Sequence, residues 1–372
     1  MSFSTTGMKK LKVDIPFLIS VCILVIGGYL IFVSASMGLL SQQATKYSGV
    51  AFSQTVLGLL FGTIACIITT KLDYKIYRKY SFYIFILSII ATLLVFVHGI
   101  GIAHGGAHRW IYLGPVSFQP SEFLKIAFVL YFSAWLAGVK EEAQSFKYGF
   151  LPFIILTIII GWILLKQPDT DTFLITVFAG LGILLSDGGR WKYILVSCLL
   201  GIVGITAMAY SHTYLMNRIK TFINPQENSL STGYQIKQSL IAIGNGGMFG
   251  RGFGQSIQKF GGLPEPIGDS IFAVASEEFG FIGALTIISL FVFFAFRGLK
   301  IATKVPDTFG RLVVVGIVIM IVSQAFVNIG AMVGVLPLSG ITLPFISHGG
   351  TSLFMTLAEV GIILNISKNK KK

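Results

Sequence analysis

Residues 15–36 read IPFLISVCILVIGGYLIFVSAS, an apolar stretch without a charged residue that is long enough to cross a bilayer as one helix. It is too long for the core of a signal peptide, and no cleavage site of small residues follows it, so we expect a retained anchor. Nine similar stretches follow along the chain. The ten expected spans are residues 15–36, 50–70, 80–100, 121–138, 149–166, 171–186, 192–210, 270–296, 311–335 and 350–367.

The composition excludes a water-soluble protein. Of the 372 residues, 54% are hydrophobic and 12% are charged, whereas soluble domains carry about 25% charged residues. The same numbers exclude a disordered tail and a disulfide scaffold. A β-barrel is excluded because its strands would alternate in polarity rather than give continuous apolar runs. We therefore predict an all-α polytopic membrane protein that folds as a single integral membrane domain over residues 1–372.

The net charge of +13 fits the same class of protein. An excess of lysine and arginine is typical of cytoplasmic loops in membrane proteins, and no nucleic-acid partner is expected. With the N-terminus in the cytoplasm, most basic residues fall on the cytoplasmic side, including Lys9, Lys10 and a lysine-rich C-terminal end suited to anionic lipid. An even number of spans then places both termini in the cytoplasm.

Two segments on the expected outer side are too apolar for ordinary loops. Residues 101–120 contain Trp110 and other large side chains, so we expect this segment to pack into the membrane interface. The large loop at 211–269 contains Ile236, Leu240 and Ile243 at helical spacing. That spacing predicts an amphipathic helix at the interface. The short span at 171–186 follows Pro168 closely and is expected to be half of a broken helix.

Three other patterns are discounted as chemical sites. The glycine-rich stretch at 244–254 lacks the Gly-Lys-Ser/Thr of a phosphate-binding loop. His104 and His108 have a zinc-compatible spacing only on a helix, and two glycines between them oppose a helix. The three cysteines lie in apolar runs without metal-site spacing: Cys22, Cys66 and Cys198.

Charged residues at membrane depth are costly and therefore mark functional candidates. Glu122 and Lys125 are three residues apart and share a helical face. They form either a structural ion pair or a charged wall of a substrate cavity, with Arg109 above it for an anionic group. Asp169 and Asp171 form either a turn and helix cap or a site for a divalent cation with waters.

Asp269 lies directly before the eighth expected span, at the outer rim of the bundle. A carboxylate in this place either caps the helix or acts as a general base on a hydroxyl. Glu277 and Glu278, two turns further on, must face protein or water rather than lipid.

These clusters, taken in order, resemble the SEDS family (shape, elongation, division and sporulation), which includes FtsW, RodA and SpoVE. The resemblance covers nearly the whole chain, and its wording is more like the division members than the elongation members. The motifs that carry it are HRW at 108–110, FQPSEFLK at 118–125, QPD at 167–169, GYQ at 233–235, QSLIAIG at 238–244, QK at 258–259, LPEP at 263–266, DSIFAV at 269–274, EE at 277–278, LP at 336–337, TLPF at 342–345 and SHGG at 347–350.

The resemblance implies a peptidoglycan glycosyltransferase that polymerises lipid II with release of undecaprenyl diphosphate. It implies a class B penicillin-binding protein and other division proteins as partners, and a site on the outer face of the bacterial cytoplasmic membrane, at the septum. Asp269 is the expected base. A divalent cation, Mg²⁺ or Mn²⁺, could assist the departing diphosphate. The positions implied in substrate binding are Arg109, Glu122, Lys125, Asp169, Gln235, Gln238, Gln258, Lys259, Glu277, Ser347, Gly349 and Gly350.

Three of the motifs depart from the family pattern. Ile267 and Gly268 stand where His-Thr is common, Asp171 replaces a glycine, and His348 replaces a tyrosine. These changes leave the surroundings and the pH dependence of Asp269 open. Alternative functions are a lipid II flippase, a non-catalytic scaffold for division proteins, and the elongation enzyme of the same family.

Overall fold

The computed structural model describes residues 12–42, 44–104, 107–113, 116–211, 213–224 and 232–369. Part of the expected outer loop (225–231) and the basic residues Lys9, Lys10, Lys370, Lys371 and Lys372 lie outside the described residues. The elements are α1 (Ile15–Gln42), α2 (Ala44–Phe52), η1 (Ser53–Phe61), α3 (Gly62–Lys71), α4 (Tyr74–Leu93), η2 (Leu94–Phe96), β1 (Gly101–His104), β2 (Ala107–Leu113), β3 (Val116–Phe118), α5 (Pro120–Val139), η3 (Lys140–Gln144), η4 (Phe146–Phe150), α6 (Leu151–Lys166), α7 (Thr170–Ser186), α8 (Trp191–Ser211), α9 (Thr213–Ile223), α10 (Thr232–Asn245), η5 (Gln258–Phe260), α11 (Ile271–Lys304), α12 (Thr308–Met332) and α13 (Gly350–Ser367).

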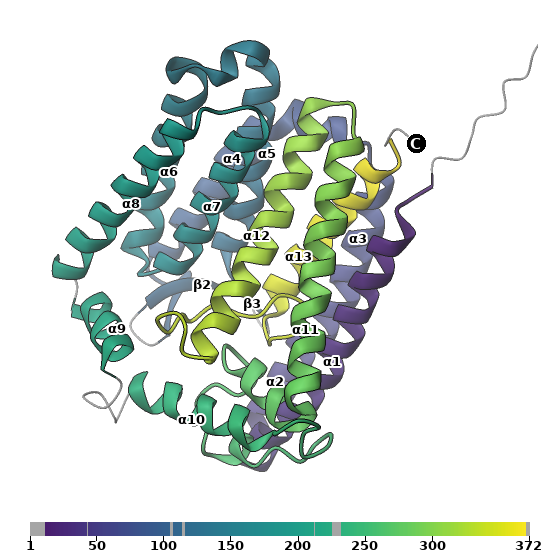
Figure 1. Ribbon diagram of the computed structural model, residues 1–372, viewed down its shortest axis with the longest axis vertical. Coiled ribbons are helices and arrows are strands. Elements are labelled where there is room, and N and C mark those ends of the chain that lie inside the picture. Colours follow the sequence, from purple (N-terminus) through teal and green to yellow (C-terminus); the bar gives the residue numbers. More distant parts are fainter. Residues whose placement is uncertain are drawn as a thin grey trace, which may run out of the picture.

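The helical membrane architecture predicted from the sequence is confirmed (Figure 1). Eight helices within the described residues are long and apolar enough to cross a bilayer. The other two expected spans correspond to shorter apolar helices, Thr170–Ser186 and Trp191–Gly204. The expected span at 50–70 is built from α2, the π-helix η1 and α3 in succession.

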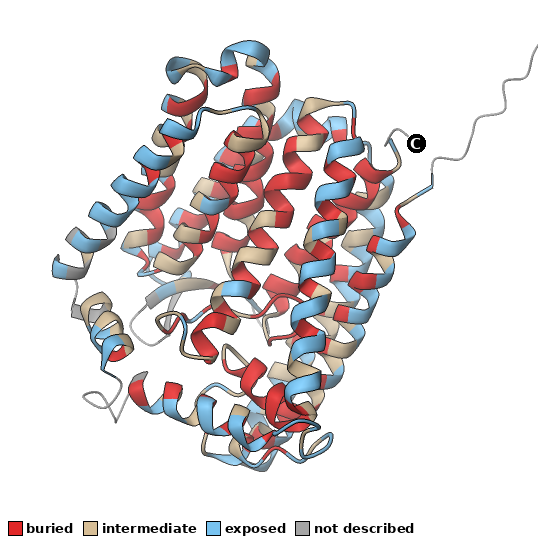
Figure 2. Cartoon of the chain, in the orientation of Figure 1, coloured by how far each residue is buried: buried red, intermediate tan, exposed pale blue. Residues whose placement is uncertain are grey.

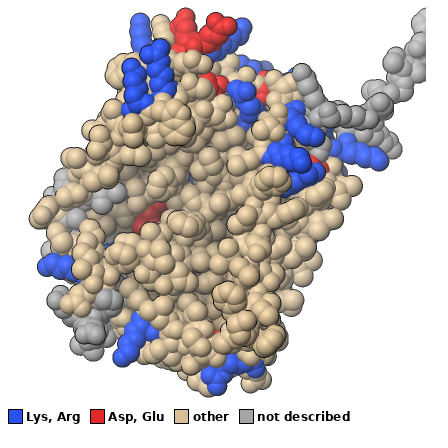
Figure 3. Space-filling view, in the orientation of Figure 1, with Lys and Arg blue, Asp and Glu red and all other residues tan. Residues whose placement is uncertain are grey.

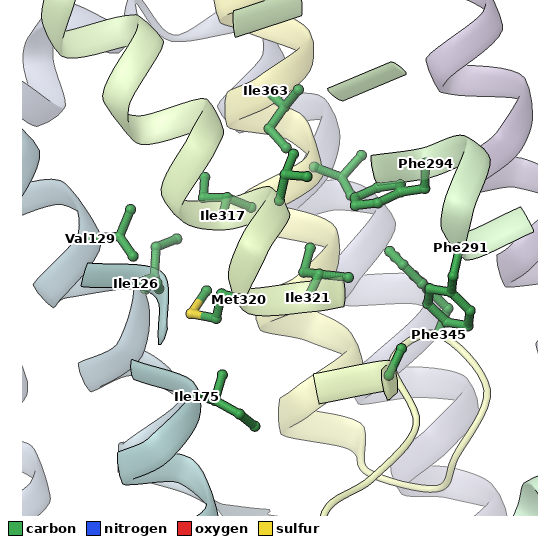
Figure 4. Close-up of a cluster of buried hydrophobic side chains, with 14 of the residues drawn as sticks. Ile126, Val129, Ile175, Phe291, Phe294, Ile317, Met320, Ile321, Phe345 and Ile363 are labelled. Atoms are coloured by element: carbon green, nitrogen blue, oxygen red, sulfur yellow. The ribbon is translucent and has the colours of Figure 1, made fainter. Parts of the chain in front are cut away.

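Helix α12 occupies the middle of the bundle. It packs against α5, α7, α11 and α13, and α13 packs in turn against α3. Figure 2 shows α12 mostly buried, whereas α8 at one edge is mostly exposed. In the core shown in Figure 4, Ile317 and Met320 of α12 lie among side chains of α5, α7, α11 and α13. Between membrane helices, close van der Waals packing of this kind drives association, because lipid is as apolar as the core.

The exterior of the bundle is suited to lipid. On the face seen in Figure 3, most basic side chains gather near the two ends of the molecule, and the broad band between them shows little charge apart from one recessed acidic group. Large apolar side chains are exposed on the helices, among them Leu195, Val203 and Phe296, each about two-thirds exposed (64%, 65% and 64%). So much exposed apolar surface would be a liability in water, and in a bilayer it contacts acyl chains.

The strands β1, β2 and β3 form a small antiparallel sheet in the order β1-β2-β3. The sequence predicted a packed interfacial segment here and did not predict strands. Ile111 of β2 is paired with Phe118 of β3 and is buried. The sheet fixes Arg109 of β2 close to the N-terminus of α5 and the start of α7, which brings two parts of the expected site together.

Helix α10 is confirmed, but its buried face differs from the predicted one. Leu240 is 45% exposed, whereas Ile236, Ser239 and Ala242 are buried. The physical reason is that α10 packs against α11, and the small side chains Ser239 and Ala242 allow a close approach that leucine would prevent.

The expectation that 171–186 is half of a broken helix is wrong, because α7 folds back on α6, where Gly161 of α6 lies against Phe173 of α7. Helix α7 runs without interruption over Thr170–Ser186, and the interrupted helix is α11, where Gly280 adopts φ +67° and ψ −166°. The backbone groups freed at this kink bond to a neighbouring segment: Phe281 N donates to Gly247 O at 2.8 Å, and Gly252 N donates to Glu278 O at 2.9 Å. The kink therefore ties α11 to the outer segment 247–252.

Substituting Gly280→Ala is expected to destabilise the protein by roughly 1–3 kcal/mol, because a side chain strains this backbone conformation. A Cβ atom at Gly280 would also clash with the backbone nitrogen of Gly250. The control is Gly201→Ala in α8, where a Cβ meets no atom within 4 Å. Thermal unfolding in detergent should show a lower midpoint for Gly280→Ala alone, and equal midpoints for both variants would contradict the prediction.

Candidate active site

Asp269 lies directly before α11, at the end of the segment that joins α10 to α11. Its Oδ1 accepts a hydrogen bond from Gln235 Nε2 of α10 at 3.0 Å, and the same amide nitrogen donates to Ser270 Oγ at 3.0 Å. The carboxylate is half-buried, so it is held by protein on one side and remains accessible on the other. A positioned, partly accessible carboxylate is what a general base requires.

The backbone around Asp269 is fixed by the chain that follows α12. Ser347 Oγ donates to Gly268 O at 2.7 Å, and His348 N donates to Ile267 O at 2.7 Å. Asn328 of α12 donates through Nδ2 to Asp269 O at 2.8 Å. Helix α12 and the loop that follows it thus hold residues 267–269 through three hydrogen bonds to main-chain oxygens, which restricts the direction of the carboxylate.

Burial raises the pKa of Asp269 from 3.8 to about 7. The hydrogen bonds from Gln235 and Ser270 lower this pKa, and the charge of Glu265 raises it, but burial has the largest effect. A base works best when its pKa lies near the operating pH. Asp269 is therefore poised both to accept a proton and to release it.

His348 connects the residues before Asp269 to helix α1. Its ring stacks on Phe32 of α1, with ring centroids 6.0 Å apart. Burial lowers the pKa of His348 to about 4, so the imidazole is neutral at physiological pH. Its Nε2 is buried and has no hydrogen-bond partner within the described part of the chain.

A second polar cluster brings Arg109 together with Asp169, two residues that are far apart in the sequence. Arg109 of β2 donates through Nε to Gln167 O at 3.2 Å and through Nη2 to Pro168 O, and its Nη1 lies 3.8 Å from Asp169 Oδ1. Ser121 at the start of α5 donates to Asp169 Oδ2 at 3.3 Å. The Arg109 side chain is 14% exposed, so it is partly accessible to an anionic ligand.

Glu122 and Lys125 form the expected ion pair, with Lys125 Nζ 3.1 Å from Glu122 Oε1. Lys125 Nζ also donates to Gln324 Oε1 of α12 at 2.8 Å, and Gln324 Nε2 donates to Thr342 O at 3.0 Å. Gln324 and Asn328 are one helical turn apart on α12. This face of α12 therefore connects the buried ion pair to the loop that holds Asp269.

Sequence reasoning missed Gln324 and Asn328, and also Gln54. Gln54 Oε1 accepts from Gly349 N at 3.0 Å, and its Nε2 donates to Ser347 O at 3.2 Å. The available signal was a polar amide inside an otherwise apolar span, since buried amides in membranes need partners.

Lys259 and Glu277 are buried and engaged with protein. Lys259 Nζ lies 2.7 Å from Glu278 Oε1, and both side chains are fully buried. Ser256 Oγ donates to Glu277 Oε2 at 2.5 Å, and Gln258 N donates to the same oxygen at 3.3 Å. In this arrangement the cluster fastens the segment between α10 and α11 to α1 and α11, and a direct contact of these side chains with substrate stays a prediction.

The other predicted substrate contacts fall into two groups. Gln235, Ser347 and Gly349 lie in the hydrogen-bond network around Asp269. Gln238 is half-buried on α10, and Gly350 is buried at the start of α13. Their roles in substrate binding stay predictions.

The carboxylates that the sequence suggested for a divalent cation do not fit one. Asp169 is paired with Arg109, and Asp171 Oδ2 lies 2.9 Å from Arg218 Nη1. Cation ligands of this type need free carboxylate oxygens. Within the described residues no group of three or more His, Cys, Asp or Glu side chains is suited to a metal. A requirement for Mg²⁺ or Mn²⁺ stays a prediction, and no step below depends on it.

Comparison with known proteins places this site in a family. The model of the cell cycle protein family of FtsW, RodA and SpoVE matches residues 15–372. The chain belongs to this family. Stage V sporulation protein E of Bacillus subtilis (strain 168) is 39% identical over 82% of this chain and 84% of that protein. A probable peptidoglycan glycosyltransferase FtsW of Geobacter metallireducens is 38% identical over 97% of this chain and 96% of that protein.

Solved structures of FtsW/RodA/SpoVE type share the fold. A chain from a structure titled as the structural coordination of polymerization and crosslinking by a peptidoglycan synthase complex aligns with a TM-score of 0.79 at 26% identity, covering 95% of this chain and 97% of that one. The rod shape determining protein RodA of Thermus thermophilus aligns with a TM-score of 0.69 at 25% identity, covering 97% and 98%. The predicted fold class, a multi-pass bacterial membrane protein, is confirmed. The prediction of an enzyme is confirmed as well, since several relatives are named probable peptidoglycan glycosyltransferases.

Proposed function

We propose that this chain polymerises lipid II into β-1,4-linked glycan strands. The observation that carries the proposal is Asp269, a half-buried carboxylate whose pKa burial raises to about 7 and whose backbone is held by α12 and the loop that follows it. The proposal assigns Asp269 to the outer face, where the sugar of lipid II is available after export, and both termini to the cytoplasm.

In the proposed reaction, the 4-hydroxyl of the acceptor GlcNAc attacks C1 of the MurNAc on the donor chain. Asp269 takes the hydroxyl proton as the new C1–O bond forms. The bond from C1 to undecaprenyl diphosphate breaks on the opposite side, so the configuration at C1 inverts. The diphosphate leaves with the bonding electron pair and needs positive charge nearby.

Arg109 is the best placed of the three predicted cationic groups for the leaving diphosphate. Its side chain is 14% exposed, whereas that of Lys125 is 5% exposed and that of Lys259 is fully buried. A guanidinium can bind a phosphate through two parallel hydrogen bonds. Lys125 would instead have a structural role, because its contacts with Glu122 and Gln324 connect α5 to α12.

We further propose that the chain acts at the division septum with a class B penicillin-binding protein and other division proteins. The relatives named FtsW and the structural neighbour from a peptidoglycan synthase complex support this role. The elongation enzyme of the same family is the second candidate, supported by the likeness to RodA.

A polymerisation assay tests the proposal. The purified chain, with its candidate transpeptidase and Mg²⁺ or Mn²⁺, receives lipid II, and the products are resolved by length. Glycan strands are expected. A folded complex that yields no glycan but moves lipid II across liposomes would establish the flippase instead, and one that does neither would leave the scaffold.

The pH dependence provides a further prediction. A base must be unprotonated, so kcat/KM for lipid II should rise with pH and level off above about 7, the pKa of Asp269. Gln235→Leu removes a hydrogen bond that lowers this pKa, and the rising limb should then move to higher pH. The exposed Gln255→Leu serves as the control, and identical profiles for Gln235→Leu and wild type would contradict the assignment.

A further inference from the structure

A polar pocket lies at the end of the bundle opposite Asp269. It has a volume of about 550 Å³ and is formed where α3 ends, α4 begins, α11 passes into α12, and α13 ends. Its lining includes Lys71, Lys75 and Lys368 together with Asp73 and Asp307. The volume is within the range of about 300–1,000 Å³ typical of small-ligand sites.

The two carboxylates of this pocket already have partners. Asp73 Oδ1 accepts from Lys75 N at 3.0 Å, where it caps α4. Asp307 Oδ2 accepts from Gly310 N at 3.0 Å, and its Oδ1 lies 4.0 Å from Arg78 Nη1. Both acids are thus used to cap helices, and their charge is partly offset.

The lysines of the pocket are less occupied. Lys368 Nζ donates to Thr70 O at 2.6 Å. The ammonium groups of Lys71 and Lys75 are exposed and have no ion pair among the residues that the structure describes. The pocket therefore presents two free positive charges on either side of the turn between α3 and α4.

Apolar surface flanks these two lysines. Ile68 and Leu72 beside Lys71 are 50% and 42% exposed, and Ile76 beside Lys75 is 45% exposed. These side chains belong to the ends of two membrane spans, Thr45–Lys71 and Tyr74–Phe96. The pocket thus lies at the depth of lipid headgroups, with acyl-facing surface next to it.

We propose that this pocket binds the headgroup of an anionic phospholipid. The Lys71 and Lys75 ammonium groups pair with the phosphate, since lysine binds phosphate as a point charge. The acyl chains lie along the exposed apolar side chains of α3 and α4. A zwitterionic lipid is disfavoured because its own cation offsets the phosphate charge that the two lysines would pair.

Lipid binding to the double variant Lys71→Ala/Lys75→Ala tests the proposal. Purified wild type and variant are titrated in detergent with phosphatidylglycerol, phosphatidylcholine or inorganic phosphate, and native mass spectrometry counts bound lipid. Each lysine near an anionic lipid contributes roughly a factor of five in affinity. We expect about 20-fold weaker phosphatidylglycerol binding in the double variant, with phosphatidylcholine binding unchanged.

The matched control is Lys147→Ala/Lys192→Ala, which removes two exposed lysines from the same end of the protein outside the pocket. It should bind phosphatidylglycerol as wild type does. Equal loss in both double variants, no loss in the pocket variant, or equal competition by inorganic phosphate would each overturn a lipid site in this pocket. A thermal unfolding midpoint for the pocket variant equal to that of wild type shows that a loss of binding does not arise from misfolding.

Discussion

Replacing Asp269 by Asn is expected to slow lipid II polymerisation by about 100- to 10,000-fold, the usual contribution of a general base. The amide keeps the size of the side chain but cannot accept the hydroxyl proton. The hydrogen bonds from Asn328 and Ser347 go to backbone oxygens of Asp269 and Gly268 and are unaffected. Lipid II binding should therefore change little, and the loss should appear in kcat.

Asp73→Asn is the matched control. Asp73 caps α4 at the opposite end of the bundle, and asparagine caps a helix about as well as aspartate. This variant should polymerise lipid II at the rate of wild type. Unimpaired polymerisation by Asp269→Asn, with glycan of normal length, would show that another group takes the proton.

Replacing Lys259 by Met is expected to destabilise the protein by about 3–5 kcal/mol, the usual cost of leaving a buried charge without its partner. Lys259 Nζ contacts Glu278 Oε1 at 2.7 Å, Ser34 Oγ at 2.9 Å and Gly254 O at 2.9 Å. Without the ammonium group, the Glu278 carboxylate keeps the Ser34 hydroxyl as a donor but loses its counter-ion.

Thermal unfolding in detergent measures this effect, with exposed Lys237→Met on α10 as the control. The double variant Lys259→Met/Glu278→Gln removes both charges, and it should recover a large part of the lost stability because the two groups are coupled. A single Lys259→Met variant as stable as the control would mean that the ion pair contributes nothing to the fold.

Charged residues near the candidate site have two different roles: some hold the fold together, and others can contact a ligand. Lys259 and Glu278 fasten the segment between α10 and α11 to α1 and α11, whereas the Arg109 side chain keeps some exposed surface beside Asp169. We therefore expect Lys259 variants to lose folded protein.

The sequence by itself determined the class of protein and the place of its acid. Long uncharged runs such as 15–36 fold as helices in lipid, because a helix forms the hydrogen bonds of the backbone N–H and C=O groups within a single segment. Asp269 directly precedes the apolar run that becomes α11, and this position predicted a carboxylate at one end of the helix bundle. The pairing of Glu122 with Lys125 also followed from the sequence, because helical spacing is local.

The tertiary structure decided everything that depends on distant contacts. Arg109 meets Asp169, Asn328 meets Asp269, and Lys259 meets Glu278, and no periodicity within one segment encodes which helices become neighbours. The interruption of a helix fell at Gly280, where the backbone adopts φ +67° and lies against Gly250, a conformation that favours glycine. The pKa of Asp269 likewise follows from burial, which exists only once the bundle has formed.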